Sequence, residues 1–150
     1  MSLPRVYFAH PITAYCSAEE ACALARLKSE GLDVTNPSDR HHQDACGSDM
    51  VRWAALAGSC DGVAFMPFPD GAIGAGVVKE VNTLWAQNKP VFELTPDGNT
   101  LSAVSDWPGA RTLLTVDETR ERLKEFREQR VAQGLTPVPV RDPNAGAPRP

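Results

Sequence analysis

Short apolar runs that alternate with helical segments are the feature that most limits how this chain can fold. Each run is rich in Val, Phe or Leu, and most are closed by a proline or a polar turn. A short run with such a boundary predicts a buried strand. These strands are predicted at residues 5–9, 32–35, 62–66 and 91–94. Because helical patterns separate them, the chain is predicted to be an α/β protein with a doubly wound parallel sheet.

Capping residues mark where the predicted helices begin. Ser17 is followed three residues later by Glu20, and Thr115 by Glu118, which is the spacing of a capping box. Ser48 or Asp49 begins another helix in the same way, as residues that favour the N-cap. The helices are predicted at residues 17–30, 48–59, 77–87 and 115–133.

The segments between these elements are predicted as loops, with one further strand and a tail. Residues 36–48 are polar, and residues 67–76 are rich in glycine and proline, so both are predicted as loops. A fifth short strand is predicted at 113–114. The chain is then a single domain over 1–133, followed by a proline-rich tail over 134–150. That tail holds little to bury and is predicted to be flexible or to lie on a neighbouring subunit.

Composition argues against several classes of function. The 150 residues carry a net charge of −4, which disfavours a broad basic surface for duplex nucleic acid. The sequence has no apolar run of about 18 residues, so no membrane span is predicted. The first residues lack the pattern of a secretory signal, and a cytoplasmic protein is therefore expected.

The cysteines and histidines do not form a recognised metal motif. Four cysteines occur, none in a C-x-x-C pair: Cys16, Cys22, Cys46 and Cys60. Reduced thiols are expected of a cytoplasmic chain. A zinc site built from them with His41 and His42 is the alternative, although its spacing fits no usual zinc motif. No metal and no cofactor is predicted.

Parallel sheets of this kind bind ligands outside the carboxyl ends of their strands. Three segments, 8–12, 36–49 and 67–80, follow predicted strands and are expected to converge there. The third leads through a glycine-rich turn into a helix that carries Glu80. A glycine-rich turn lets a backbone approach a ligand, and its free N–H groups can hold an anion. In the alternative interpretation, Glu80 only favours the helix dipole.

A family resemblance rests on segments between about residues 5 and 94. They are Tyr7-Phe8-Ala9-His10-Pro11-Ile12, Gly31-Leu32-Asp33-Val34-Thr35-Asn36-Pro37, Cys60-Asp61-Gly62-Val63, Gly76-x-x-x-Glu80 and Asn88-Lys89-Pro90-Val91. In this order and spacing they resemble the nucleoside 2-deoxyribosyltransferase-like superfamily, in particular its small bacterial and phage relatives. The resemblance implies a flavodoxin-like sheet of four to five strands and a homo-oligomer that often completes its site from a neighbouring subunit.

The resemblance also implies a chemistry. The glutamate that matches Glu80 is the nucleophile of the family's enzymes, attacking C1′ of a nucleoside or nucleotide and displacing the base. A carboxylate suits an oxocarbenium-like transition state and can form a glycosyl ester. A second acid must protonate the leaving base. Relatives carry an aspartate where this chain has Trp53, so Asp49, one helical turn earlier, is the candidate acid, with a helix cap as its alternative role.

The expected function is cleavage or base exchange at the N-glycosidic bond of a nucleoside or nucleoside 5′-monophosphate. The alternative is a non-catalytic nucleotide-binding module of the same fold. The candidate catalytic residues are Glu80 and Asp49. The candidate substrate-binding residues are Tyr7, Ala9, His10, Pro11, Asp70, Gly74 and Gly76. For Asp70 an ordinary Asp-Gly turn is the alternative, and for Tyr7 it is packing in the core.

Overall fold

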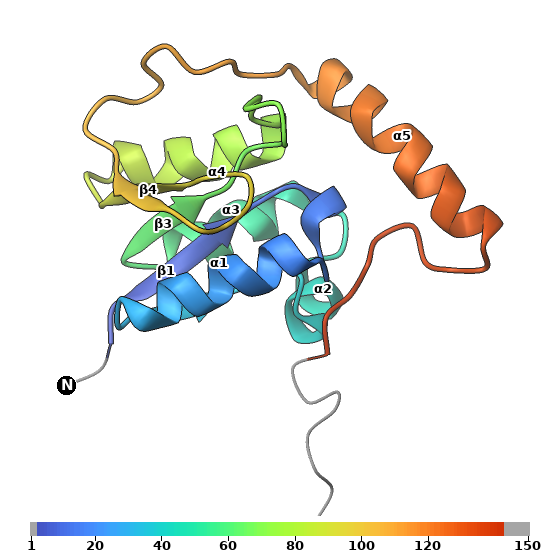
Figure 1. Cartoon of the computed structure of the whole chain (residues 1–150), viewed down its shortest axis with the longest axis horizontal. Coiled ribbons are helices and arrows are strands. Elements are labelled where there is room, and N and C mark those ends of the chain that lie inside the picture. Colours follow the sequence, from blue (N-terminus) through green and yellow to red (C-terminus); the bar gives the residue numbers. More distant parts are fainter. Residues whose placement is uncertain (1–2, 143–150) are drawn as a thin grey trace, which may run out of the picture.

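The chain folds around a five-stranded sheet with the strand order β2-β1-β3-β4-β5. The structure is a computed structural model that describes residues 3–142. The strands are β1 (Arg5–Ala9), β2 (Asp33–Thr35), β3 (Gly62–Phe65), β4 (Val91–Leu94) and β5 (Leu101–Ala103). The helices are the 3-10 turn η1 (Ile12–Ala14), α1 (Ala18–Ser29), α2 (Arg40–Cys46), α3 (Met50–Gly58), α4 (Ala75–Ala86) and α5 (Val116–Ala132). Figure 1 shows this arrangement.

The first four strands are parallel, as the alternation of strands and helices predicts. β1 pairs with both β2 and β3, and β3 pairs with β4. The order 2-1-3-4-5 is that of flavodoxin-like sheets. The predicted α/β fold with a flavodoxin-like sheet is confirmed, with the difference that the edge strand β5 is antiparallel.

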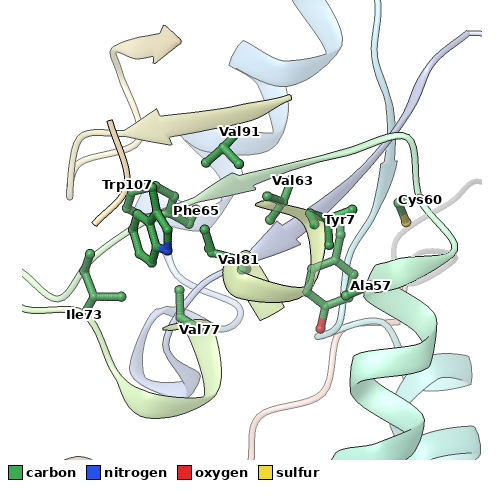
Figure 2. Packing of buried hydrophobic residues seen from close by; sticks show 12 residues of the cluster. Tyr7, Ala57, Cys60, Val63, Phe65, Ile73, Val77, Val81, Val91 and Trp107 are labelled. Carbon is green, nitrogen blue, oxygen red and sulfur yellow. The ribbon is translucent and has the colours of Figure 1, made fainter. Parts of the chain in front are cut away.

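Helices cover both faces of the sheet because β1 is apolar on both sides. Val6 and Phe8 pack into one buried cluster, which includes Leu27 of α1. Tyr7 and Ala9 point the other way, into a cluster shared with α3 and α4. Figure 2 shows this second cluster, in which side chains of β1, β3 and α4 meet. The alternation of side chains along a strand thus builds a two-sided core.

The fifth strand lies elsewhere than the sequence predicts. β5 pairs with β4 across a short turn, whereas Leu113 makes only an isolated parallel bridge to Ile73. The turn depends on Gly98, whose φ is 77° and where an added Cβ would lie 2.5 Å from the Glu19 carbonyl oxygen. The prediction of a strand at 113–114 is therefore wrong. Hairpin geometry and a close approach to α1, rather than local apolarity, decide which segment pairs.

The segment 36–48 is not a continuous loop. It contains α2, a short helix that begins after Asp39 and buries Cys46, while most of its other side chains stay partly or fully exposed. Gln43 anchors it by donating from its side-chain amide to the Pro37 carbonyl at 2.7 Å. The prediction of a loop rested on the polar composition of this segment. A helix with so small a buried face needs few apolar residues, so that composition does not exclude it.

The predicted helix starts are confirmed with small changes. Ser17 accepts a hydrogen bond from the Glu20 N–H, but the Glu20 side chain turns into the protein, so the predicted capping box is only half formed. Thr115 and Glu118 make both bonds of theirs. α4 begins at Ala75, two residues before the predicted start.

The described part of the predicted tail touches the domain. Arg141 donates its N–H to the Ser38 carbonyl at 2.7 Å and accepts from the Arg40 N–H at 2.8 Å. Its guanidinium also contacts the Asp39 carboxylate at 2.8 Å. Pro139 beside it is buried. The rest of the tail, 143–150, lies outside the described residues.

Candidate functional site

The candidate site is a cavity of about 150 Å³ at the carboxyl ends of β1 and β3. β1 lies between β2 and β3, so the strand order reverses beside it, which is where ligands bind in open α/β sheets. The turn after β1, α3, the loop before α4, α4 itself and α5 form the walls. Small-molecule sites usually measure ~300–1,000 Å³. In this conformation the cavity therefore accommodates the reacting part of a ligand rather than a whole nucleotide.

Glu80 and Tyr7 form the polar floor of the cavity. Glu80 stands in the second turn of α4 and is 9% exposed, and Tyr7 comes from β1. The Tyr7 hydroxyl donates a hydrogen bond to Oε2 of Glu80. In Figure 2 this hydroxyl points away from the side chains of Val63 and Val91. The two residues that the sequence places on different elements are thus brought together, one orienting the other.

Burial controls the ionisation of this pair. It raises the pKa of Glu80 to about 8, although the hydrogen bond from Tyr7 acts in the opposite direction. Burial and the nearby Glu80 carboxylate raise the pKa of Tyr7 well above its usual value. Tyr7 therefore remains a protonated donor at neutral pH, while Glu80 exchanges its proton in a range useful for catalysis.

A second buried pair, His10 and Glu20, supports the turn after β1. His10 Nε2 lies 2.8 Å from Glu20 Oε2, and Nδ1 lies 2.9 Å from the Phe8 carbonyl oxygen. The imidazole also stacks on the Phe8 ring, with centroids 3.8 Å apart. Burial would raise the pKa of Glu20, but the hydrogen bond and charge of His10 outweigh it, and the pKa is lowered. Because both ring nitrogens are engaged, His10 lines the cavity without a free nitrogen.

Sequence reasoning missed Glu20 as a structural partner of the site. Glu20 is 2% exposed and shares the buried face of α1 with Ala23 and Leu27. A carboxylate on an otherwise apolar helical stripe is the signal that could have found it, since buried acids are almost always paired.

Aromatic side chains form much of the remaining wall. Tyr15, Trp53 and Phe68 line the cavity. Trp53 donates from its indole nitrogen to the Gly47 carbonyl at 2.9 Å. Within residues 3–142, the Tyr15 hydroxyl makes no hydrogen bond. Burial, followed by the charges of Glu80 and Glu20, raises the Tyr15 pKa far above its usual value, so this phenol stays protonated. No local pattern in the sequence indicates this role for Tyr15.

The start of α4 is closed by α5. Ala75, the first residue of α4, donates its N–H to the Thr119 hydroxyl at 2.9 Å. At Gly74 an added Cβ would lie 3.3 Å from both the Phe68 ring and the Thr119 methyl group. A glycine is favoured at this position because α5 packs so closely over it. Thr119 and Leu123 of α5 line the cavity, which sequence reasoning did not anticipate.

Two predicted carboxylates do not line the cavity. Asp49 caps α3, accepting from the N–H groups of Val51 at 3.0 Å and Arg52 at 3.3 Å, and is half exposed. This is the alternative role that the sequence allowed. Asp70 forms a two-bond ion pair with Arg122, at 3.0 and 2.8 Å. The hydrogen bond from Arg122 is the main reason that the pKa of Asp70 is lowered.

The other predicted substrate-binding residues include some that line the cavity and one that does not. His10, Pro11, Gly74 and Gly76 line the cavity, whereas Ala9 is fully buried in the sheet. Of the three segments expected to converge, 36–49 contributes no lining residue. Its place is taken by α3, which contributes Met50 and Trp53.

Comparisons of this chain with protein-family models, with curated proteins and with solved structures gave no match. The family resemblance described above therefore rests on its sequence segments alone. The four cysteines are free thiols. Within residues 3–142, no group of three or more His, Cys, Asp or Glu side chains is placed to hold a metal ion. No helix in this part of the chain is both long and apolar enough to cross a membrane.

Proposed function

We propose that this protein cleaves or exchanges the N-glycosidic bond of a nucleoside or nucleoside 5′-monophosphate, with Glu80 as the nucleophile. The observation that carries this proposal is the buried Glu80 carboxylate, hydrogen-bonded by Tyr7 in a cavity at the switch point of the sheet. Structural carboxylates are rarely so buried without a cationic partner.

In the proposed reaction, Oε1 or Oε2 of Glu80 attacks C1′ of the sugar. A C1′–O bond forms, the C1′–N bond breaks, and its electron pair leaves with the base, which takes up a proton from solvent water. Water or a second base then attacks C1′ and releases Glu80. The Tyr7 hydroxyl holds one carboxylate oxygen, so the attacking group is oriented before the substrate arrives. The aromatic side chains that line the cavity provide faces on which a flat base would stack.

The state of Glu80 sets the expected dependence of rate on pH. A nucleophile must be ionised, and burial raises the Glu80 pKa to about 8. Activity should therefore rise with pH up to about this value in the free enzyme. An opposite profile would assign Glu80 to the role of acid.

The cavity offers the leaving base a different hydrogen-bond donor from the one that the sequence predicts. Asp49 caps α3 and does not line the cavity. Tyr15 does line it, and within residues 3–142 its hydroxyl makes no hydrogen bond. We propose that Tyr15 donates a hydrogen bond to the bound ligand, since its raised pKa keeps the proton in place.

The test is base release from a panel of nucleosides and 5′-monophosphates, followed by chromatography. Glu80→Gln keeps the volume and removes the charge, so we expect it to lose at least about a thousandfold in rate, or ~4 kcal/mol of barrier. Glu19→Gln, at an exposed position on α1, is the matched control and should behave as wild type. Retention of more than about a tenth of the activity by Glu80→Gln would rule out covalent catalysis at this residue.

A non-catalytic nucleotide-binding module remains the second candidate. It is favoured by one observation: among the described residues that line the cavity, Glu80 is the only carboxylate. A nucleotide that raises the melting temperature without any release of base would support this second function and contradict the first.

We also propose a cytoplasmic homo-oligomer. On α4, Leu84 is fully buried, whereas Trp85 is 37% exposed. Met50 and Val51 add exposed apolar surface at the start of α3, near the mouth of the cavity. A monomer in light scattering at micromolar concentration would contradict self-association.

A further inference from the structure

α5 supplies a wall of the cavity although it lies far from the sheet in sequence. Its buried residue is Leu123, 7% exposed, which faces the cavity together with Thr119. On the same helix, Arg122 forms an ion pair with Asp70. The Arg122 guanidinium also lies 5.1 Å from the centre of the Phe68 ring. In Figure 1, long connecting segments join α5 to the domain at both ends.

The Thr119 hydroxyl takes one of the hydrogen-bonding positions that an anion would use at the start of α4. The first N–H groups of a helix have no partner within the helix and are a common binding site for phosphate. Here the Ala75 N–H donates to Thr119 Oγ1 at 2.9 Å, and the same hydroxyl donates to the Thr115 carbonyl at 2.8 Å. The Thr119 methyl group would lie 3.3 Å from a Cβ added at Gly74, so α5 packs closely over the start of α4. A phosphate could reach this amide only by displacing Thr119.

The charges around the cavity disfavour an anion as well. Among the lining residues in the described part of the chain there is no lysine and no arginine. Arg122, on the same helix as Thr119, is committed to Asp70 by two hydrogen bonds. The buried Glu80 adds negative charge whenever it ionises. A phosphate dianion here would thus lose hydration without gaining a cation.

We propose that Thr119 is a specificity-determining residue that excludes a 5′-phosphate, so that the site accepts an uncharged nucleoside. This inference rests on the proposed function for its class of ligand. It goes further by assigning the choice between nucleoside and nucleotide to one hydroxyl on α5.

The test measures binding rather than turnover. 2′-Deoxyadenosine and thymidine, each compared with its own 5′-monophosphate, are titrated by calorimetry into wild type, Thr119→Ala and Thr119→Ser. Wild type should bind at least one nucleoside at least about tenfold more tightly than its monophosphate. Thr119→Ala should reduce this preference by about tenfold, the effect of one hydrogen bond to a charged group. Thr119→Ser keeps the hydroxyl and should keep the preference.

Thr83→Ala is the matched control, since this hydroxyl donates only to the Lys79 carbonyl within α4. Melting temperatures of all variants show whether each one folds. A wild type that prefers the monophosphate, or a preference unchanged in folded Thr119→Ala, would overturn the proposal. Base release measured on the same samples separates the two claims: a nucleoside preference without release contradicts only the proposed function. Failure of wild type to bind either kind of ligand would contradict both.

Discussion

At the scale of single residues, the site contains two buried carboxylates whose pKa values shift in opposite directions. Glu20 is buried beside His10, and its pKa is lowered. Glu80 is buried with the Tyr7 hydroxyl as its only hydrogen-bonding partner among residues 3–142, and its pKa is raised to about 8. A buried carboxylate with a cationic partner stabilises the fold in its charged form. A buried carboxylate without such a partner stabilises the fold only while it is protonated. Such a mismatch is typical of residues kept for chemistry rather than for stability.

The charge on Glu80 should therefore make wild type less stable as pH rises. The folded state holds this proton up to about pH 8, whereas an unfolded glutamate loses it near 4.5. Between these values the folded state binds more protons, so stability falls with rising pH, by up to about 5 kcal/mol for this group. Glu80→Gln should lack this loss. Urea unfolding at pH 5, 7 and 9 measures the difference between the two proteins.

The difference should be small at pH 5 and should favour Glu80→Gln increasingly at pH 7 and 9. Groups other than Glu80 are common to both proteins and cancel in the comparison. Glu19→Gln should follow wild type at each pH. Parallel stability curves for wild type and Glu80→Gln would show that Glu80 is ionised in the folded protein at all three values.

At the scale of elements, two segments outside the central sheet fix the site and its surroundings. α5 closes the cavity through Thr119 and Leu123. The chain after α5 returns to α2, where Arg141 pairs with Ser38, Asp39 and Arg40. The long return from α5 is thus anchored at its far end, although its composition predicts no packing.

Removal of this anchor should weaken the fold measurably. Truncation after Gly134 deletes two backbone hydrogen bonds and an ion pair made by Arg141, and it exposes the surface under Pro139. We expect a loss of about 1–3 kcal/mol in the free energy of unfolding. Truncation after Asp142 keeps these contacts and serves as the control. Denaturant melts that coincide for the two truncated proteins would show that the Arg141 contacts contribute nothing.

At the scale of the whole molecule, the sequence predicts the central parallel strands better than the elements around them. The four parallel strands are predictable because a short apolar run that is closed by a turn is typical of a buried strand. β5 and α2 are not, because a hairpin edge and a short polar helix depend on neighbours rather than on local pattern. The same holds for the site. Local motifs indicate Glu80 and Tyr7, whereas Thr119 reaches the cavity only through packing of a distant helix.

The most direct test of the central claim is the mass of the peptide that contains Glu80 after rapid acid quenching with a cleaved nucleoside. A nucleophilic Glu80 predicts that this peptide gains the mass of the sugar residue, with free base released in equal amount in the first turnover. Glu80→Gln should show neither the adduct nor the burst of base. Release of base by wild type with no adduct on this peptide, together with substantial activity in Glu80→Gln, would contradict the account.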